Sequence, residues 1–187
     1  MKIRYIIITL SVIVLTVIAL GVLFRHEIQR FLLYQEYGKE IASLCTAPVS
    51  GQATNAVLPP KPWHALVIEG DKQHLWHNRL PDEVRATGRD SVDAVICLSP
   101  TRSAVVEECA ARTIVAEEHT IPRIQYYRDV TIFSAQTRQP IGTLRVYGAA
   151  PQDCGPFVQV TQKGVVFKGE QPTFRNFYDT IINVLWY

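Results

Sequence analysis

Residues 123–147 read RIQYYRDVTIFSAQTRQPIGTLRVY, and this stretch decides the fold that the sequence predicts. Residues 123–134 are rich in Tyr, Val, Ile and Phe, which favour β-strands. Residues 135–139 form a turn, and residues 141–147 return as an antiparallel strand. This register places four apolar side chains on one face, and that shared face predicts a sheet with one core side: Val130, Ile132, Leu144 and Val146.

Further strands are expected upstream of this hairpin. Residues 64–69 and 72–77 flank Gly70-Asp71 and predict a hairpin with a two-residue turn. Residues 92–98 and 104–115 predict the next two strands. Between them, residues 80–86 have a proline at a first helical position beside acidic residues, which is typical of one or two helical turns. The sheet is therefore expected to have five to seven strands and to be mostly antiparallel.

The C-terminus predicts an amphipathic helix. Thr173, after Pro172, is a suitable N-cap residue. The apolar residues that follow recur at helical spacing and must cover another surface, most simply one face of the sheet: Phe174, Phe177, Tyr178, Ile181, Ile182, Leu185 and Trp186. The fold class is therefore α+β, with a C-terminal amphipathic helix behind a mostly antiparallel β-sheet.

An uncharged run, YIIITLSVIVLTVIALGVLF, occupies residues 5–24. Twenty residues in a helix cross a hydrocarbon core about 30 Å thick. We therefore expect an uncleaved N-terminal transmembrane helix, with the lipid bilayer as its partner. A cleaved signal peptide is the alternative, although its best cleavage site, Ala19-Leu20-Gly21, lies inside the apolar run.

The sequence predicts four successive parts: a transmembrane anchor (1–24), a helical stalk (25–45), a Pro-rich linker (46–62) and an α+β domain (63–187). Positive charge is nearly balanced across the anchor and favours a cytoplasmic N-terminus only slightly. Long domains translocate largely regardless of charge. The expected topology is therefore single-pass, with a cytoplasmic N-terminus and an extracytoplasmic C-terminal domain.

Four cysteines, none of them in a C-x-x-C pair, all follow the apolar run: Cys45, Cys97, Cys109 and Cys154. An even number suits disulfide bonds in an oxidising compartment. The expected strand order brings Cys109 and Cys154 to the same end of the sheet, so they form the candidate disulfide. Cys45 and Cys97 are the remaining pair. Four buried, reduced thiols in a cytoplasmic domain are the alternative.

Two histidines are the only titratable pair with a geometric reason to meet. If the first hairpin extends through residue 77, His64 and His77 become cross-strand neighbours. His74 would point to the opposite face. Two ligands without a third do not make a zinc site.

Motifs of known chemistry are missing from the sequence: it has no G-x-S-x-G, G-x-G-x-x-G, G-x-x-x-x-G-K or H-E-x-x-H. We therefore expect no catalytic, cofactor-binding or metal-binding residues. The net charge of +2, with charges interspersed, argues against a nucleic-acid surface.

Six segments carry a resemblance to a group of bacterial proteins: LPDEVRAT (80–87), VDAVICLS (92–99), EEC (107–109), RIQYYRDVTIF (123–133), AQTRQPIG (135–142) and GAAPQDC (148–154). Together they resemble uncharacterised membrane-tethered proteins that join a small β-rich domain to an anchor or signal. The resemblance covers residues 64–155. Where such proteins often carry a Thr-Gly turn, this chain has Thr137-Arg138. The resemblance implies an envelope-facing domain and no known activity.

The function expected from the sequence is that of a non-enzymatic, membrane-anchored, extracytoplasmic accessory or binding module. Another membrane or envelope protein is the candidate partner. Two alternatives stay open: an envelope enzyme, either a hydrolase or a redox enzyme, and a domain that binds a small ligand or a metal through His64 and His77.

Overall fold

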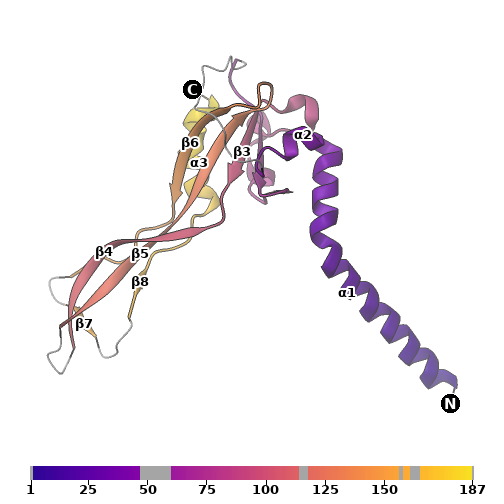
Figure 1. Ribbon diagram of the computed structural model, residues 1–187, viewed down its shortest axis with the longest axis horizontal. Coiled ribbons are helices and arrows are strands. Elements are labelled where there is room, and N and C mark those ends of the chain that lie inside the picture. Colours follow the sequence, from indigo (N-terminus) through magenta and orange to yellow (C-terminus); the bar gives the residue numbers. More distant parts are fainter. Residues whose placement is uncertain (1, 47–59, 114–117, 156–157, 161–164, 187) are drawn as a thin grey trace.

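The computed structural model describes residues 2–46, 60–113, 118–155, 158–160 and 165–186. Figure 1 shows three parts: a long N-terminal helix, a head in which strands and helices pack together, and an arm of strands that projects from the head. The helix α1 (Lys2–Tyr37) and the arm leave the head in different directions.

One eight-stranded sheet runs through the head and the arm. Its strands are β1 (Ala65–Glu69), β2 (Lys72–Gln73), β3 (Ala94–Leu98), β4 (Arg102–Thr113), β5 (Glu118–Ser134), β6 (Pro140–Tyr147), β7 (Val158–Val160) and β8 (Phe167–Lys168). The α+β class and the C-terminal helix agree with the sequence analysis, but the mostly antiparallel sheet of five to seven strands does not. Three pairs are parallel, β1 with β3, β4 with β7 and β5 with β8, so the sheet is mixed.

The chain between β2 and β3 explains the parallel pair in the head. It contains three short 3₁₀ helices, η1 (His77–Arg79), η2 (Asp82–Val84) and η3 (Arg89–Ser91). This crossover returns the chain to the start of β1, so β3 runs in the same direction as β1. A tight hairpin, which would have made β3 antiparallel, is not formed here.

Strand β5 connects the head to the arm. Its last five residues pair with β3, and its first half pairs with β4 in the arm. On its other side it pairs with β6 and β8. Val130 lies opposite Leu144, and Val130, Ile132 and Val146 are all buried, which confirms the core face predicted for this hairpin.

Helix α3 (Phe174–Trp186) covers one face of the head sheet. The backbone N–H of Asn176 donates to Oγ1 of Thr173 at 3.4 Å, so Thr173 caps the helix as predicted. Phe177, Ile181 and Leu185 are buried against the inward side chains of the sheet. The spacing of apolar residues therefore correctly identified the face that α3 buries.

The end of α1 covers the other face of the same sheet. Leu33 and Tyr37 are 2% and 1% exposed and belong to one buried cluster with Leu66, Ile68 and other side chains of β1 and β3. Gly38, with φ 83°, separates α1 from the short helix α2 (Lys39–Ala42). Residues 25–45, which the sequence describes as a stalk, thus supply part of the core.

The expected transmembrane anchor at residues 5–24 is corrected. Among the helices in the part of the chain that the structure describes, none combines the length and the apolarity needed to span a membrane. The apolar run is the first part of a 36-residue helix whose last turns pack in the head core. The single-pass topology, with its cytoplasmic N-terminus and extracytoplasmic domain, is corrected with it.

Two disulfide bonds link the described residues. Cys109 and Cys154 are joined with a Cα–Cα distance of 5.4 Å, as the strand order predicted. Cys45 and Cys97 are joined with a Cα–Cα distance of 5.2 Å and attach the corner after α2 to β3. In the chain-entropy view each bridge contributes about 4 kcal/mol by restricting the unfolded chain. Such bonds are typical of proteins in oxidising compartments.

Two glycines allow two chain segments to meet backbone to backbone where the arm joins the head. Gly148 begins the segment after β6, and Gly169 begins the segment after β8. The N–H of Glu170 donates to the carbonyl oxygen of Ala149 at 3.1 Å. A Cβ atom on Gly148 would overlap the carbonyl oxygen of Glu170, and one on Gly169 would overlap that of Ala149. The segments Gly148-Ala-Ala-Pro151 and Gly169-Glu-Gln-Pro172 thus meet in a close backbone contact.

We expect Gly148→Ala to lower the free energy of unfolding by about 1–3 kcal/mol, because the methyl group must displace backbone. Gly142→Ala is the matched control. A Cβ atom on Gly142 meets nothing within 4 Å, so its effect should stay within about 0.5 kcal/mol. Urea unfolding of both variants measures the difference, and equal midpoints would show that the backbone contact does not constrain Gly148.

The β5–β6 turn holds Arg138 at φ 61°, a left-handed conformation that costs a non-glycine residue about 1–2 kcal/mol. Its guanidinium forms an ion pair with Glu40 of α2. Both side chains are more than half exposed, so the pair contributes about 0–1 kcal/mol. The backbone of the turn is thus strained at Arg138, and a glycine at this position would relieve the strain.

Replacing Arg138 separates these two contributions. Arg138→Gly relieves the strain, loses only an exposed ion pair and should leave the protein as stable as the native chain or more so. Arg138→Val loses the same pair but keeps the positive φ, which β-branched residues tolerate worst, and should cost about 1 kcal/mol or more. Thermal unfolding compares the variants; Val and Gly of equal stability would contradict the strain.

Candidate functional site

The two histidines that the sequence paired across a hairpin have different environments. Strand β2 ends at Gln73, and the chain turns into η1, where the N–H of His77 donates to the carbonyl of His74 at 2.9 Å. Nδ1 of His64 instead lies 3.1 Å from a carboxylate oxygen of Asp93. The predicted hairpin with a two-residue turn is present, with Ile68 opposite Gln73, but its pairing does not continue to the histidines.

His77 is 2% exposed and lies between η1 and the end of α1. The hydroxyl of Tyr37 donates to the carbonyl oxygen of Ala86 at 3.3 Å and lies 3.3 Å from Nε2 of His77. Nδ1 of His77 is buried and has no hydrogen-bond partner in the part of the chain that the structure describes. Burial lowers the pKa of His77 to about 4, so the ring is neutral at pH 7 and helps to fix α1 on the head.

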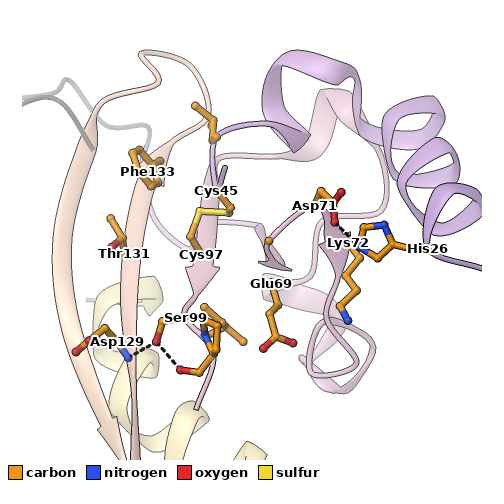
Figure 2. A pocket seen from close by; sticks show the side chains of 14 residues that line it. His26, Cys45, Glu69, Asp71, Lys72, Cys97, Ser99, Asp129, Thr131 and Phe133 are labelled. Atoms are coloured by element: carbon orange, nitrogen blue, oxygen red, sulfur yellow. Dashed lines mark hydrogen bonds and ion pairs between the residues drawn. A yellow bond between two sulfur atoms is a disulfide. The ribbon is translucent and has the colours of Figure 1, made fainter. Parts of the chain in front are cut away.

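A cavity of about 510 Å³ opens on the sheet face that α1 and α2 partly cover. Figure 2 shows the Cys45–Cys97 bond on one wall of the cavity, with Asp71 and Lys72 to one side and Asp129 to the other. Its lining combines polar and charged groups with apolar side chains and the disulfide: His26, Glu69, Asp71, Lys72, Ser99, Asp129, Thr131, Leu44, Leu98, Pro100 and Phe133.

The carboxylates of the cavity are already paired with cations. Oε1 of Glu69 lies 3.0 Å from Nη1 of Arg128. Asp71 lies 3.8 Å from Nη1 of Arg30, and Asp129 lies 2.8 Å from Nε of Arg145. These pairs compensate the negative charge of the lining, so the acidic side chains stabilise the walls rather than form a free cation site.

Metal binding is not supported by the described residues. They contain no group of three or more His, Cys, Asp or Glu side chains arranged to hold an ion. The hypothesis of a site built on His64 and His77 therefore lacks both the pairing and the third ligand that a metal requires.

The base of the arm is held by Arg123 of β5, whose side chain is 11% exposed. Its guanidinium pairs with Glu107 of β4, lies 2.7 Å from Oδ1 of Asp153 and donates to the carbonyl oxygen of Pro151 at 2.9 Å. Nearby, the Cys109–Cys154 bond ties β4 to the same segment. Arg123 and the disulfide therefore fix the arm at two points.

The base of the arm also exposes two adjacent apolar side chains. Val105 is 56% exposed and Val106 is 49% exposed. The pairing of β4 with β5 shifts between Val105 and Glu107, which is a β-bulge and re-aims the side chains around it. All seven side chains from Arg102 to Glu108 are exposed, so both faces of β4 are open to solvent over this length.

The sequence did not identify either the cavity or the exposed patch. The cavity is formed by residues from α1, the corner after α2, the β1–β2 hairpin, β3 and β5, and only the fold brings these five segments together. The arm had one local signal, two consecutive valines followed by two glutamates. That signal was read as part of an ordinary strand, because nothing in it shows that β4 leaves the head.

Comparison with known proteins returns no match, whether with family models, with curated proteins or with solved structures.

We expect the free energy of unfolding to fall as the pH drops from about 6.5 to about 4. In that range the unfolded chain protonates His77 and the folded protein does not. The contribution of the neutral ring is complete above pH 6.5, and about 3 kcal/mol of it is lost by pH 4. His77→Gln should flatten the curve by about 1.4 kcal/mol per pH unit, as measured by urea unfolding.

Tyr37→Phe is the control for this experiment. It removes the hydroxyl 3.3 Å from Nε2 but keeps the ring buried, and burial is the main cause of the lowered pKa. The variant should therefore keep the pH dependence. A His77→Gln curve as steep as that of the native protein would contradict the assignment.

Proposed function

We propose that the chain is a non-enzymatic protein-binding module of an oxidising compartment and that the arm is its binding element. The observation that carries the proposal is the pair Val105 and Val106, which is about half exposed at the base of the arm. Adjacent exposed apolar side chains on a projecting strand are typical of a contact surface for another protein.

The construction of the arm supports this assignment. Over residues 102–108 every side chain of β4 is exposed, and residues 122–129 of β5 are all partly exposed. Within the residues that the structure describes, no second layer covers this part of the sheet, whereas α3 and α1 cover the head sheet. The part of the arm next to the head therefore presents both its faces to a partner.

The arm is also held in place before any partner binds. The Cys109–Cys154 bond and the Arg123 ion pairs join β4, β5 and the segment around Asp153. A binding surface that is already ordered loses less conformational entropy on association. The fixed base thus favours recognition of a protein over a role as a spacer.

The charges around the patch indicate the kind of partner. Glu107, which is paired with Arg123, and Glu108 follow the valines directly, and both are exposed. Interfaces commonly place apolar side chains at the centre and charged ones at the rim. We infer a partner that offers apolar side chains flanked by Lys or Arg.

The double variant Val105→Glu/Val106→Glu tests the proposal. The tagged full chain is recovered from its native source, and the co-purifying proteins are quantified for the native and variant forms. We expect one specific protein to fall roughly tenfold in the variant, because charges replace the apolar centre of the contact. Thermal unfolding should be unchanged, since both side chains are exposed.

Leu75→Glu is the matched control. Leu75 is 78% exposed but lies in the head, so the partner should be retained. A photo-crosslinking residue at position 106 should form an adduct with the same protein, whose affinity is then measured with purified components. Unchanged recovery with the arm variant, or equal loss with the control, would overturn the proposal.

A further inference from the structure

We propose that the Cys45–Cys97 bond is a site of thiol–disulfide exchange for a small dithiol that enters the cavity on the α1 side of the sheet. The inference rests on the position of this bond and is independent of the binding role of the arm.

The bond forms part of the cavity wall. Both cysteines line the space of about 510 Å³, and Figure 2 shows their sulfur atoms facing it from two different elements. Cys97 lies within β3 and is 9% exposed, whereas Cys45 lies in the corner after α2 and is half-buried. A small molecule in the cavity can therefore reach the Cys45 sulfur without unfolding the head.

The second disulfide provides an internal comparison. Cys109 is 1% exposed and belongs to an apolar cluster with Ala111 and Ile121. Cys154 is partly buried, as Cys45 is, but it packs against this cluster, whereas Cys45 lines the cavity. The network around Arg123 also holds the segment that carries Cys154. Exchange depends on the access of the attacking thiolate to a sulfur atom. The two disulfide bonds should therefore differ in their rate of thiol–disulfide exchange, even when both are exposed to the same reagent in the same protein.

The chemistry proceeds in two balanced steps. A thiolate of the dithiol attacks Sγ of Cys45 along the sulfur–sulfur axis, and the bond breaks with Sγ of Cys97 leaving as a thiolate, which takes a proton. The second thiol of the reagent then attacks the mixed disulfide and releases Cys45 as a thiol. The protein gains two electrons and two protons, and the dithiol is oxidised to its cyclic disulfide.

The two sulfurs differ in their freedom to move. Cys97 is fixed in β3, which pairs with β1 on one side and β5 on the other. Cys45 follows the four-residue helix α2, and its neighbour Leu44 also lines the cavity. Attack at Cys45 lets this corner move away with the reagent attached, while the strand that carries the leaving thiolate stays in place.

Reduction should change the cavity and leave the fold intact. The side chains that pack α1 and α2 against the sheet do so independently of the disulfide: Leu33, Tyr37 and Ala42. Both helices should therefore stay in place on the sheet. Leu44 and Cys45, in contrast, lose the covalent attachment that fixes them at the wall. The reduced state thus widens the cavity on this side.

The rates of reduction of the two bonds test the proposal. The full-length native protein is treated with dithiothreitol without denaturant, quenched with acid, alkylated and analysed by peptide mass spectrometry. We expect Cys45 and Cys97 to be labelled at least tenfold faster than Cys109 and Cys154, while circular dichroism stays unchanged. Equal rates, slower labelling of Cys45 and Cys97, or labelling that requires unfolding would overturn the inference.

A variant that fills the cavity tests the route of entry. Thr131 lines the cavity and lies opposite Cys97 on β5, so Thr131→Trp should slow the labelling of Cys45 and Cys97 several-fold. Ser103→Trp, at an exposed position in the arm, is the control and should not. An unchanged rate in folded Thr131→Trp would show that the thiol does not enter through the cavity. If that variant fails to fold, the proposal is still tested by the labelling rates of the two disulfides in the native protein.

Discussion

Strand β5 is the constraint on which the other parts depend, because the same 17 residues serve two different environments. Its last residues are covered on both faces, by α3 on one side and by the end of α1 on the other. Among the described residues, no helix covers its first half, where Ile121 is buried in a small cluster with Cys109 and Ala111. This half pairs with β4 and β8 in the arm, and β4 pairs in turn with β7. Since the backbone hydrogen bonds continue along one strand, the arm extends directly from the head core.

The local patterns were predictable where neighbours in sequence are also neighbours in space. The 123–147 hairpin, the buried face of α3 and the Cys109–Cys154 bond all depend on strands or turns that follow one another. The parallel pairing of β1 with β3 was missed, because it is set by a crossover of three 3₁₀ helices without a strong periodic signal. The histidine pairing failed because β2 is only two residues long.

The N-terminal helix shows why an apolar run can be misread. Hydropathy over residues 5–24 says nothing about the helix that continues beyond them. Leu33 and Tyr37 lie past the run, are separated by one turn and complete the second core layer.

The candidate sites were less predictable than the fold. The cavity needs five separate segments, and the exposed valines become unusual only when β4 is seen to leave the head.

The backbone contact between the segments that begin at Gly148 and Gly169 has a consequence for how this chain can change over evolution. The hydrogen bond from Glu170 to Ala149 closes residues 150–169 into a loop whose two ends are side by side. Insertions or deletions inside the loop alter its own length and leave the spacing of β6 and α3 untouched. The arm side of the molecule can therefore diversify while the head keeps its packing.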